Sequence, residues 1–305
     1  MLLTAFAVAV AAQDAPGVLE DALAIFQGDR VIVEYSAEGR AQLEATIEAL
    51  KVALGVPADL NETSESAVGA FPVAPEGRDL TIKLSQGYFT LGVIFAKGES
   101  DEADLYLKGK HWGLKSLRMD PDFALVEKRE GFVDAVDQET DVASLYWAGM
   151  NWLSEANFDQ VTAVFSGVAG KTVAMLERVQ ELDETYDCYG ADRVLGSVWG
   201  ALPRLPFGTY RRDLDRARSC FCRIVEDAQA CGDLAPGSVD PACTEYLGNR
   251  RAFAEYYLME KGLWSDAAQV LESVLDAPLG ETYALFNANA QADARRLLEE
   301  VGKHL

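Results

Sequence analysis

The sequence predicts an all-α protein, folded as a single compact domain from an array of antiparallel helix pairs. Apolar residues recur at helical spacing along almost the whole chain, as in 38–54, where Leu43, Ile47 and Leu50 fall on one face. Alternating strand patterns are rare; 30–35 is the one short candidate, and a loop or a helix end fits it equally well. Apolar residues make up 49% of the 305-residue chain, which is enough for a folded core.

The expected helices begin with 38–54, and the segment 61–78, rich in Ser, Pro and Gly, is expected to be a connection. A helix over 80–96 should follow, and then one over 103–118, which Asp120 and Pro121 should end. The remaining helices are expected over 142–156, 159–183, 189–202, 213–230, 246–261, 265–275 and 281–301.

These helices are expected to pack in pairs, because the second member often carries a repeat-like pattern. Gly262 is followed by Ala267, and Pro278 closes the unit, which resembles the second half of a tetratricopeptide repeat. The segments 108–121 and 195–221 show similar spacings of Gly and Ala. Inserted loops break any strict period, so the fold is expected to be a set of degenerate tetratricopeptide-like repeats. The alternative is an ordinary irregular helical domain.

The charge of the chain limits its partners. Lys and Arg number 27 against 49 Asp and Glu, which gives a formal net charge of −22 at pH 7. Nucleic acid and anionic lipid surfaces are bound through clustered positive charge, which releases their counterions. The sequence therefore excludes nucleic acid as a partner.

The N-terminus has the pattern of a secretory signal. Residues 1–12 form a run of apolar and small residues broken only by Thr4, and polar residues follow. The run is too short to cross a bilayer, and Ala9-Val10-Ala11 fits a small-residue cleavage site. We therefore expect export, with 1–12 as the signal and 13–305 as the helical domain. The alternative is an apolar N-terminal helix.

Five cysteines, at Cys188, Cys220, Cys222, Cys231 and Cys243, indicate disulfides and one remaining thiol in an exported protein. Zinc binding is disfavoured, because Cys220 and Cys222 would point to different faces of a helix and no C-x-x-C occurs. Cys231 and Cys243 flank a loop rich in Gly and Pro between two helices, and we predict a disulfide between them.

Signals for catalysis are weak. The chain has two histidines, His111 and His304, which removes most histidine-based triads and metal sites. Gly170-Lys171-Thr172 looks like the end of a phosphate-binding loop, but Phe165 stands where that loop requires a glycine. Nothing selects a hydrolase-like pair from the many carboxylates. We therefore expect no enzymatic activity and no cofactor.

An aromatic cluster is the best candidate for a ligand site. Trp147 and Asn151 lie on one expected helix, and Tyr189 and Arg193 begin another. These side chains either fill the core or line a cleft in which Arg193 holds the carboxylate of an organic anion. We predict Trp147, Asn151, Tyr189 and Arg193 as ligand-binding residues.

Residues 189–196 read YGADRVLG, and residues 213–218 read DLDRAR. This order resembles the T component (TatT) of TRAP transporters, in which a Y-G-x-x-R-x-x-G helix precedes a D-L-x-x-A-R helix. The segments 145–147 and 285–298 resemble the same family, and the resemblance runs from about Leu80 to the C-terminus.

The resemblance implies a periplasmic, all-helical protein that forms a homotrimer. It also implies a partner, the periplasmic substrate-binding protein of a TRAP-type transporter, and a small organic acid that is handed on through a cleft. No cysteine follows the signal-like segment, so we expect no lipid anchor there. The alternative function is a generic tetratricopeptide-like scaffold of the cell envelope without a small-molecule ligand.

Overall fold

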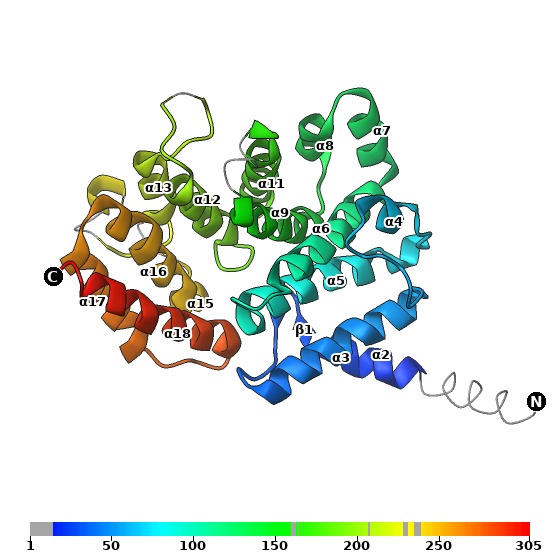
Figure 1. Cartoon of the computed structure of the whole chain (residues 1–305), viewed down its shortest axis with the longest axis horizontal. Helices are drawn as coiled ribbons and strands as arrows, with labels where there is room; N and C mark the ends of the chain where they lie inside the picture. The colour runs from blue at the N-terminus through cyan, green and yellow to red at the C-terminus, as the bar shows by residue number, and fades with distance from the viewer. Residues whose placement is uncertain (1–14, 160–162, 164, 207, 228–230, 235–238) are drawn as a thin grey trace, which may run out of the picture.

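Helices form nearly all the regular structure in the computed structural model, which describes residues 15–159, 163, 165–206, 208–227, 231–234 and 239–305. The expected all-α fold is confirmed, and it forms one compact domain (Figure 1). Within the described residues the strands are limited to an antiparallel hairpin of β1 (Phe26–Gln27) and β2 (Arg30–Val31). No helix of this part of the chain is both long and apolar enough to cross a membrane. The predicted signal, 1–12, lies outside the described residues.

The α-helices are α2 (Ala15–Ala24), α3 (Ala37–Leu54), α4 (Glu65–Ala70), α5 (Arg78–Thr90), α6 (Glu102–Arg118), α7 (Pro121–Arg129), α8 (Phe132–Gln138), α9 (Val142–Ala156), α11 (Val168–Leu182), α12 (Gly190–Ala201), α13 (Leu214–Phe221), α15 (Pro241–Thr244), α16 (Leu247–Phe253), α17 (Trp264–Asp276) and α18 (Ala284–Val301). Two π-helical segments, η2 (Leu91–Phe95) and η5 (Ala254–Met259), continue α5 and α16. Short 3₁₀ turns are η1 (Pro75–Gly77), η3 (Asn157–Asp159) and η4 (Gly232–Leu234).

Three sequence expectations about helix extent are wrong. The helix expected over 159–183 is α11, which begins only at Val168, after η3 and a turn at 166–167. The segment 61–78 is more than a connection, because Ser64 caps α4 by accepting the backbone N–H of Ala67. The helix expected over 213–230 ends at Phe221, after which the chain turns and Cys222 enters a disulfide. Most of the other boundaries agree within a few residues, and α9 occupies the expected 142–156.

Close helix packing depends on the glycines that the repeat-like pattern contains. A Cβ on Gly109 would meet the Asn151 side chain, and one on Gly113 would lie 2.7 Å from the Ala148 Cα, so α6 and α9 are in close contact. A Cβ on Gly196 would lie 2.8 Å from the Phe221 ring, which brings α12 against α13 in the same way. The tetratricopeptide-like repeat character remains a prediction.

The last helix returns to the N-terminal half of the chain, and the molecule thereby closes on itself (Figure 1). Leu285, at the start of α18, is buried in the hydrophobic cluster formed by α3, α5 and their neighbours. About two turns later, Asp293 of α18 accepts a 2.6 Å hydrogen bond from Lys97, just after η2. A partly open cavity lies between the two halves.

The disulfide predicted between Cys231 and Cys243 is wrong. Cys231 is bonded to Cys222, and Cys243 of α15 is bonded to Cys188. The reason is spatial: the chain after α13 folds back so that the Cys222 and Cys231 Cα atoms are 5.4 Å apart. Cys220 is the free thiol, and burial together with the nearby Asp192 raises its pKa to about 12.

The two disulfides should differ in their effect on stability. The Cys188–Cys243 bond closes a segment of 55 residues and the Cys222–Cys231 bond one of 9. On the chain-entropy estimate, replacing both cysteines by alanine should lower the free energy of unfolding by about 4 kcal/mol for the first pair and about 2.5 kcal/mol for the second. Chemical denaturation of the two double variants measures the difference. Unreduced peptide maps that join Cys231 to Cys243 would contradict the assignment.

Candidate functional site

Two of the predicted ligand-binding residues, Trp147 and Asn151, lie in the core of α9. The Asn151 amide donates to the Ser85 backbone oxygen at 2.8 Å and to the Trp147 backbone oxygen at 2.9 Å, and its side chain packs on Gly109. The Trp147 indole donates to the Tyr186 hydroxyl at 3.1 Å. Both residues are buried, and they hold α9 against α5 and α6. The structure thus places them in contact with each other within the core.

Tyr189 is half-buried at the start of α12, where its hydroxyl accepts the Asp240 backbone N–H at 3.2 Å. Its backbone is in the left-handed region, with φ at 60°. Asp187 and Cys188 share this conformation, with φ at 49° for each. Three consecutive non-glycine residues in this region store backbone strain that the surrounding contacts must overcome.

Arg193 holds this left-handed turn. Its guanidinium is 7% exposed, forms an ion pair with the Asp187 carboxylate, and donates to the backbone oxygens of Asp187 at 3.0 Å and Cys188 at 3.3 Å. It also donates to Asn249 of α16 at 3.0 Å and to the Tyr146 hydroxyl at 3.1 Å. These contacts join α9, α12 and α16 at one guanidinium. Because this charge is buried, it must be paired and hydrogen-bonded to remain stable there.

The Asp187 carboxylate forms both an ion pair and a hydrogen bond. The Tyr146 hydroxyl donates to it at 2.5 Å, beside the Arg193 ion pair. Burial raises the pKa of Asp187 to about 6, although the Arg193 charge acts in the opposite direction. Burial also raises the pKa of Tyr146 far above its usual range. The Asp187 backbone N–H in turn donates to Asp29, next to the β-hairpin, at 2.7 Å.

A cavity of about 480 Å³ opens beside this turn, between the two halves of the molecule. One wall comes from α5, η2, α6 and α9, and the other from α12, α16, η5 and α18 (Figure 1). Arg193 is the only one of the four predicted ligand-binding residues among the described residues that line it. The ligand-binding role of all four remains a prediction.

Among the described residues, four positive and four negative side chains line this central cavity. They are Lys97, Arg193, Arg251 and Arg296, and Glu102, Asp187, Glu255 and Asp293. Lys97 pairs with Asp293, Arg193 with Asp187 and Arg251 with Glu255. Burial alone would raise the pKa of Asp293, but the charges of Arg251 and Lys97 outweigh it and lower that pKa. The cavity therefore presents charged groups of both signs beside apolar and aromatic side chains.

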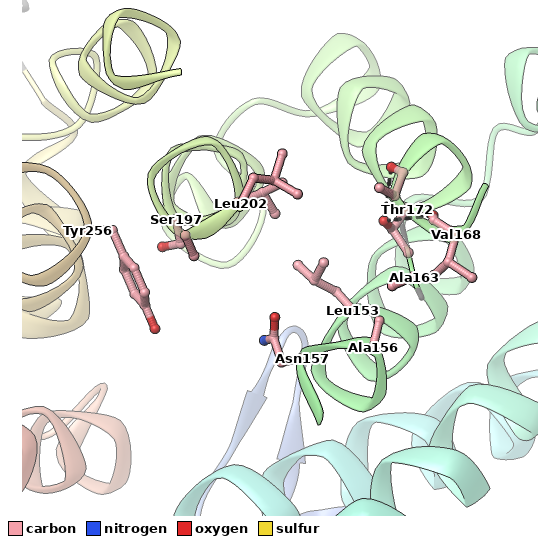
Figure 2. A pocket seen from close by; sticks show the side chains of 12 residues that line it. Leu153, Ala156, Asn157, Ala163, Val168, Thr172, Ser197, Leu202 and Tyr256 are labelled. Atoms are coloured by element: carbon pink, nitrogen blue, oxygen red, sulfur yellow. Dashed lines mark hydrogen bonds between the residues drawn. The ribbon is translucent and has the colours of Figure 1, made fainter. Parts of the chain in front are cut away.

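An apolar side compartment of about 70 Å³ adjoins the central cavity. The two share Leu153, Asn157, Ser197 and Tyr256. In Figure 2, Leu153 of α9, Leu202 at the end of α12 and Tyr256 of η5 surround the compartment from different sides. A ligand with a polar head and an apolar group would find matching surfaces here.

Both π-helical segments contribute to the cavity, from opposite walls. Val93 of η2 lines one side, and Glu255 and Tyr256 of η5 line the other. A π-helix inserts an extra residue into a turn and shifts the following side chains, and such segments are frequent at functional sites. Just before η5, in α16, the buried Arg251 Nε has no hydrogen-bond acceptor among the described residues.

Sequence reasoning missed most of the cavity, because its residues come from segments far apart in the chain. Lys97 and Asp293 are 196 positions apart, and neither stands in a recognisable motif. One local signal was present: Arg250-Arg251 and Arg295-Arg296 place pairs of cations on helices that also carry many small residues. A helix face that carries charged residues among small ones can line a cavity, although it can equally well face solvent.

The protein is all-α, and a cavity lined by charged residues lies between its two halves. Residues 71–304 match the protein family described as TRAP transporter T-component. This match covers more than half of the chain, and the chain belongs to that family. The comparison with curated proteins gives no match. The resemblance seen in the sequence is therefore confirmed, and the protein is a TRAP transporter component.

Replacing Arg193 by alanine should lower the free energy of unfolding far more than replacing Arg296. Arg193→Ala would leave the Asp187 carboxylate buried without its cation and should lower the free energy of unfolding by about 3–5 kcal/mol. Arg296→Ala removes a guanidinium that is 53% exposed, and the loss should be within about 1 kcal/mol. Thermal and urea unfolding of both variants measure the difference. Equal losses would contradict a structural role for Arg193.

Proposed function

We propose that this TRAP transporter component acts in the periplasm, where it binds a substrate-binding partner protein and relays a small organic acid through the central cavity. The observation that carries the proposal is the cavity itself, at about 480 Å³ and lined by cations and aromatic rings. Cavities of this size hold small ligands in proteins. Membership of the T-component family supports the partner, because the family is named for its transporter.

A carboxylate has a fitting position in the cavity. Arg251 has a buried Nε without an acceptor among the described residues. Arg296 of α18 is half-exposed, with its nearest carboxylate oxygens in the same part of the chain at 3.7 Å. A ligand carboxylate between these guanidinium groups would complete their hydrogen bonding, since guanidinium and carboxylate match in geometry. An apolar group of the ligand would then extend toward Leu153 and the side compartment.

Relay requires more than one opening, and the surroundings of η5 support this. A second cavity, of about 630 Å³, meets the central one at Glu255, Tyr256 and Arg296. The contact between Arg296 and Glu255 lies where the two meet, and as an ion pair at 3.7 Å with a half-exposed partner it is weak. Movement of the Arg296 side chain would join both spaces without disturbing the helices.

Binding rather than catalysis is the proposed activity. The carboxylates of the cavity accept hydrogen bonds from cations or from neutral donors, as in the Lys97–Asp293 pair at 2.6 Å. These partners fix the positions of the carboxylates. Such groups are suited to recognising charge on a ligand. We propose a homotrimer as the assembled form, as the resemblance implies.

A cavity-filling variant tests the proposal. Ser197 lines both the central cavity and its side compartment, so Ser197→Trp should occupy the space and lower ligand affinity at least about tenfold. The probes are two carboxylates, hexanoate and its 2-amino derivative norleucine, and isothermal titration calorimetry measures their binding. Wild type should bind at least one of them.

The matched control is Ser219→Trp, which changes an exposed serine on α13 that lies outside this cavity. It should bind ligand as wild type does. Both variants should still bind a TRAP-type substrate-binding protein from the same organism in gel filtration. If the wild-type protein binds the partner but neither carboxylate, the proposed relay is wrong and the alternative function, a scaffold without a small-molecule ligand, is favoured.

A further inference from the structure

Two charged groups of the central cavity are left over after its close ion pairs are formed. Lys97–Asp293, Arg193–Asp187 and Arg251–Glu255 account for six of the eight charged side chains. The remaining two are a carboxylate, Glu102, and a guanidinium, Arg296. They have opposite sign, so the cavity offers one negative and one positive position for a ligand.

Glu102 accepts hydrogen bonds only from neutral donors. Its Oε2 accepts the Gly98 backbone N–H at 2.7 Å, and its Oε1 accepts the Tyr106 hydroxyl at 3.2 Å. No Lys or Arg of the described chain lies within 4 Å of it, in contrast to the other three carboxylates of the cavity. Aromatic rings stand beside it, since Tyr106 and Phe158 both line the cavity with centroids 6.4 Å apart. A carboxylate next to aromatic faces is a suitable position for an ammonium group.

Arg296 is the complementary position. Its guanidinium makes no hydrogen bond with the described residues, and its closest carboxylate oxygens, on Glu255 and Asp293, are both at 3.7 Å. Those two carboxylates already have shorter partners, in Arg251 and Lys97. The guanidinium therefore keeps its donors available for a ligand carboxylate.

The two positions flank one ion pair. Lys97 precedes Gly98, which donates to Glu102, and the Lys97 ammonium bonds Asp293, one turn before Arg296 on α18. Both positions therefore lie beside the Lys97–Asp293 pair on the lining of the same cavity. The apolar side compartment, reached past Leu153, would accept the side chain of a ligand.

The charge of the protein decides between ligand types. A simple organic anion would approach a chain with a net charge of −22 and would unbalance a cavity with equal numbers of positive and negative groups. A zwitterion carries no net charge and matches both unpaired positions, so its burial leaves no charge uncompensated. We propose that the ligand of this cavity is a zwitterion of the amino-acid class, with its ammonium at Glu102 and its carboxylate at Arg296. This inference rests on the proposed function, whose organic acid it specifies.

Three matched compounds test it: norleucine, hexanoate, which lacks its ammonium group, and pentylamine, which lacks its carboxylate. Calorimetry on the full chain should show norleucine binding at least about tenfold more tightly than either of the others. Hexanoate binding as tightly as norleucine would overturn the inference while leaving the proposed function in place. If the wild-type protein binds neither norleucine nor hexanoate, both the proposed relay of an organic acid and this inference are contradicted.

Substitutions of Glu102 and Arg296 test which residue binds the ammonium group of the ligand and which binds its carboxylate. Glu102→Gln should weaken norleucine binding at least about tenfold and leave hexanoate unchanged, whereas Arg296→Gln should weaken both carboxylates and spare pentylamine. The controls are Asp104→Asn and Arg295→Gln, exposed neighbours on the same helices that do not line the cavity. Unchanged melting temperatures would show that all four variants fold. Norleucine affinity that survives Glu102→Gln would overturn the assignment.

Discussion

The buried guanidinium of Arg193 is the interaction on which the rest of the structure depends. It neutralises Asp187 and donates to the backbone oxygens of Asp187 and Cys188, which hold a left-handed conformation that side-chain-bearing residues avoid. A buried cation without partners would be severely unfavourable, so Tyr146 and Asn249 must remain in place to satisfy it. Helices from the middle and the C-terminal part of the chain are thereby fixed around one point, and the Cys188–Cys243 bond fastens the same turn covalently.

The central cavity follows from this constraint and from the return of α18. Once α12 and α16 are fixed by Arg193, the C-terminal helices curve back until Leu285 enters the N-terminal core and Asp293 reaches Lys97. The cavity between the two halves is lined by helix faces from both of them. Six of its eight charged side chains among the described residues form close ion pairs, which offset the cost of partly burying them.

Much of the fold could be predicted from the sequence, because helices are encoded locally. The helix over 142–156 agrees with α9, and Gly109 and Gly113 correctly indicated close packing. The family, too, was recognisable from the helix that begins at Tyr189. The disulfides were not predictable, since their pairing depends on how the chain folds back after Phe221 and around Cys188. The same holds for the cavity, whose Lys97 and Asp293 meet only in three dimensions. Arg193 was predicted as a ligand-binding residue, which remains a prediction, and its ion-pair partner Asp187, six residues away, was overlooked.

A double-mutant cycle on Arg193 and Asp187 tests the central claim most directly. Arg193→Met, Asp187→Asn and the double variant would be unfolded in urea alongside wild type, and the coupling free energy calculated from the four stabilities. If the pair fixes the turn and the surrounding helices, the coupling should be about 2–3 kcal/mol, because each single change leaves the other group buried and unpaired. A coupling below about 0.5 kcal/mol, as independent sites show, would contradict it.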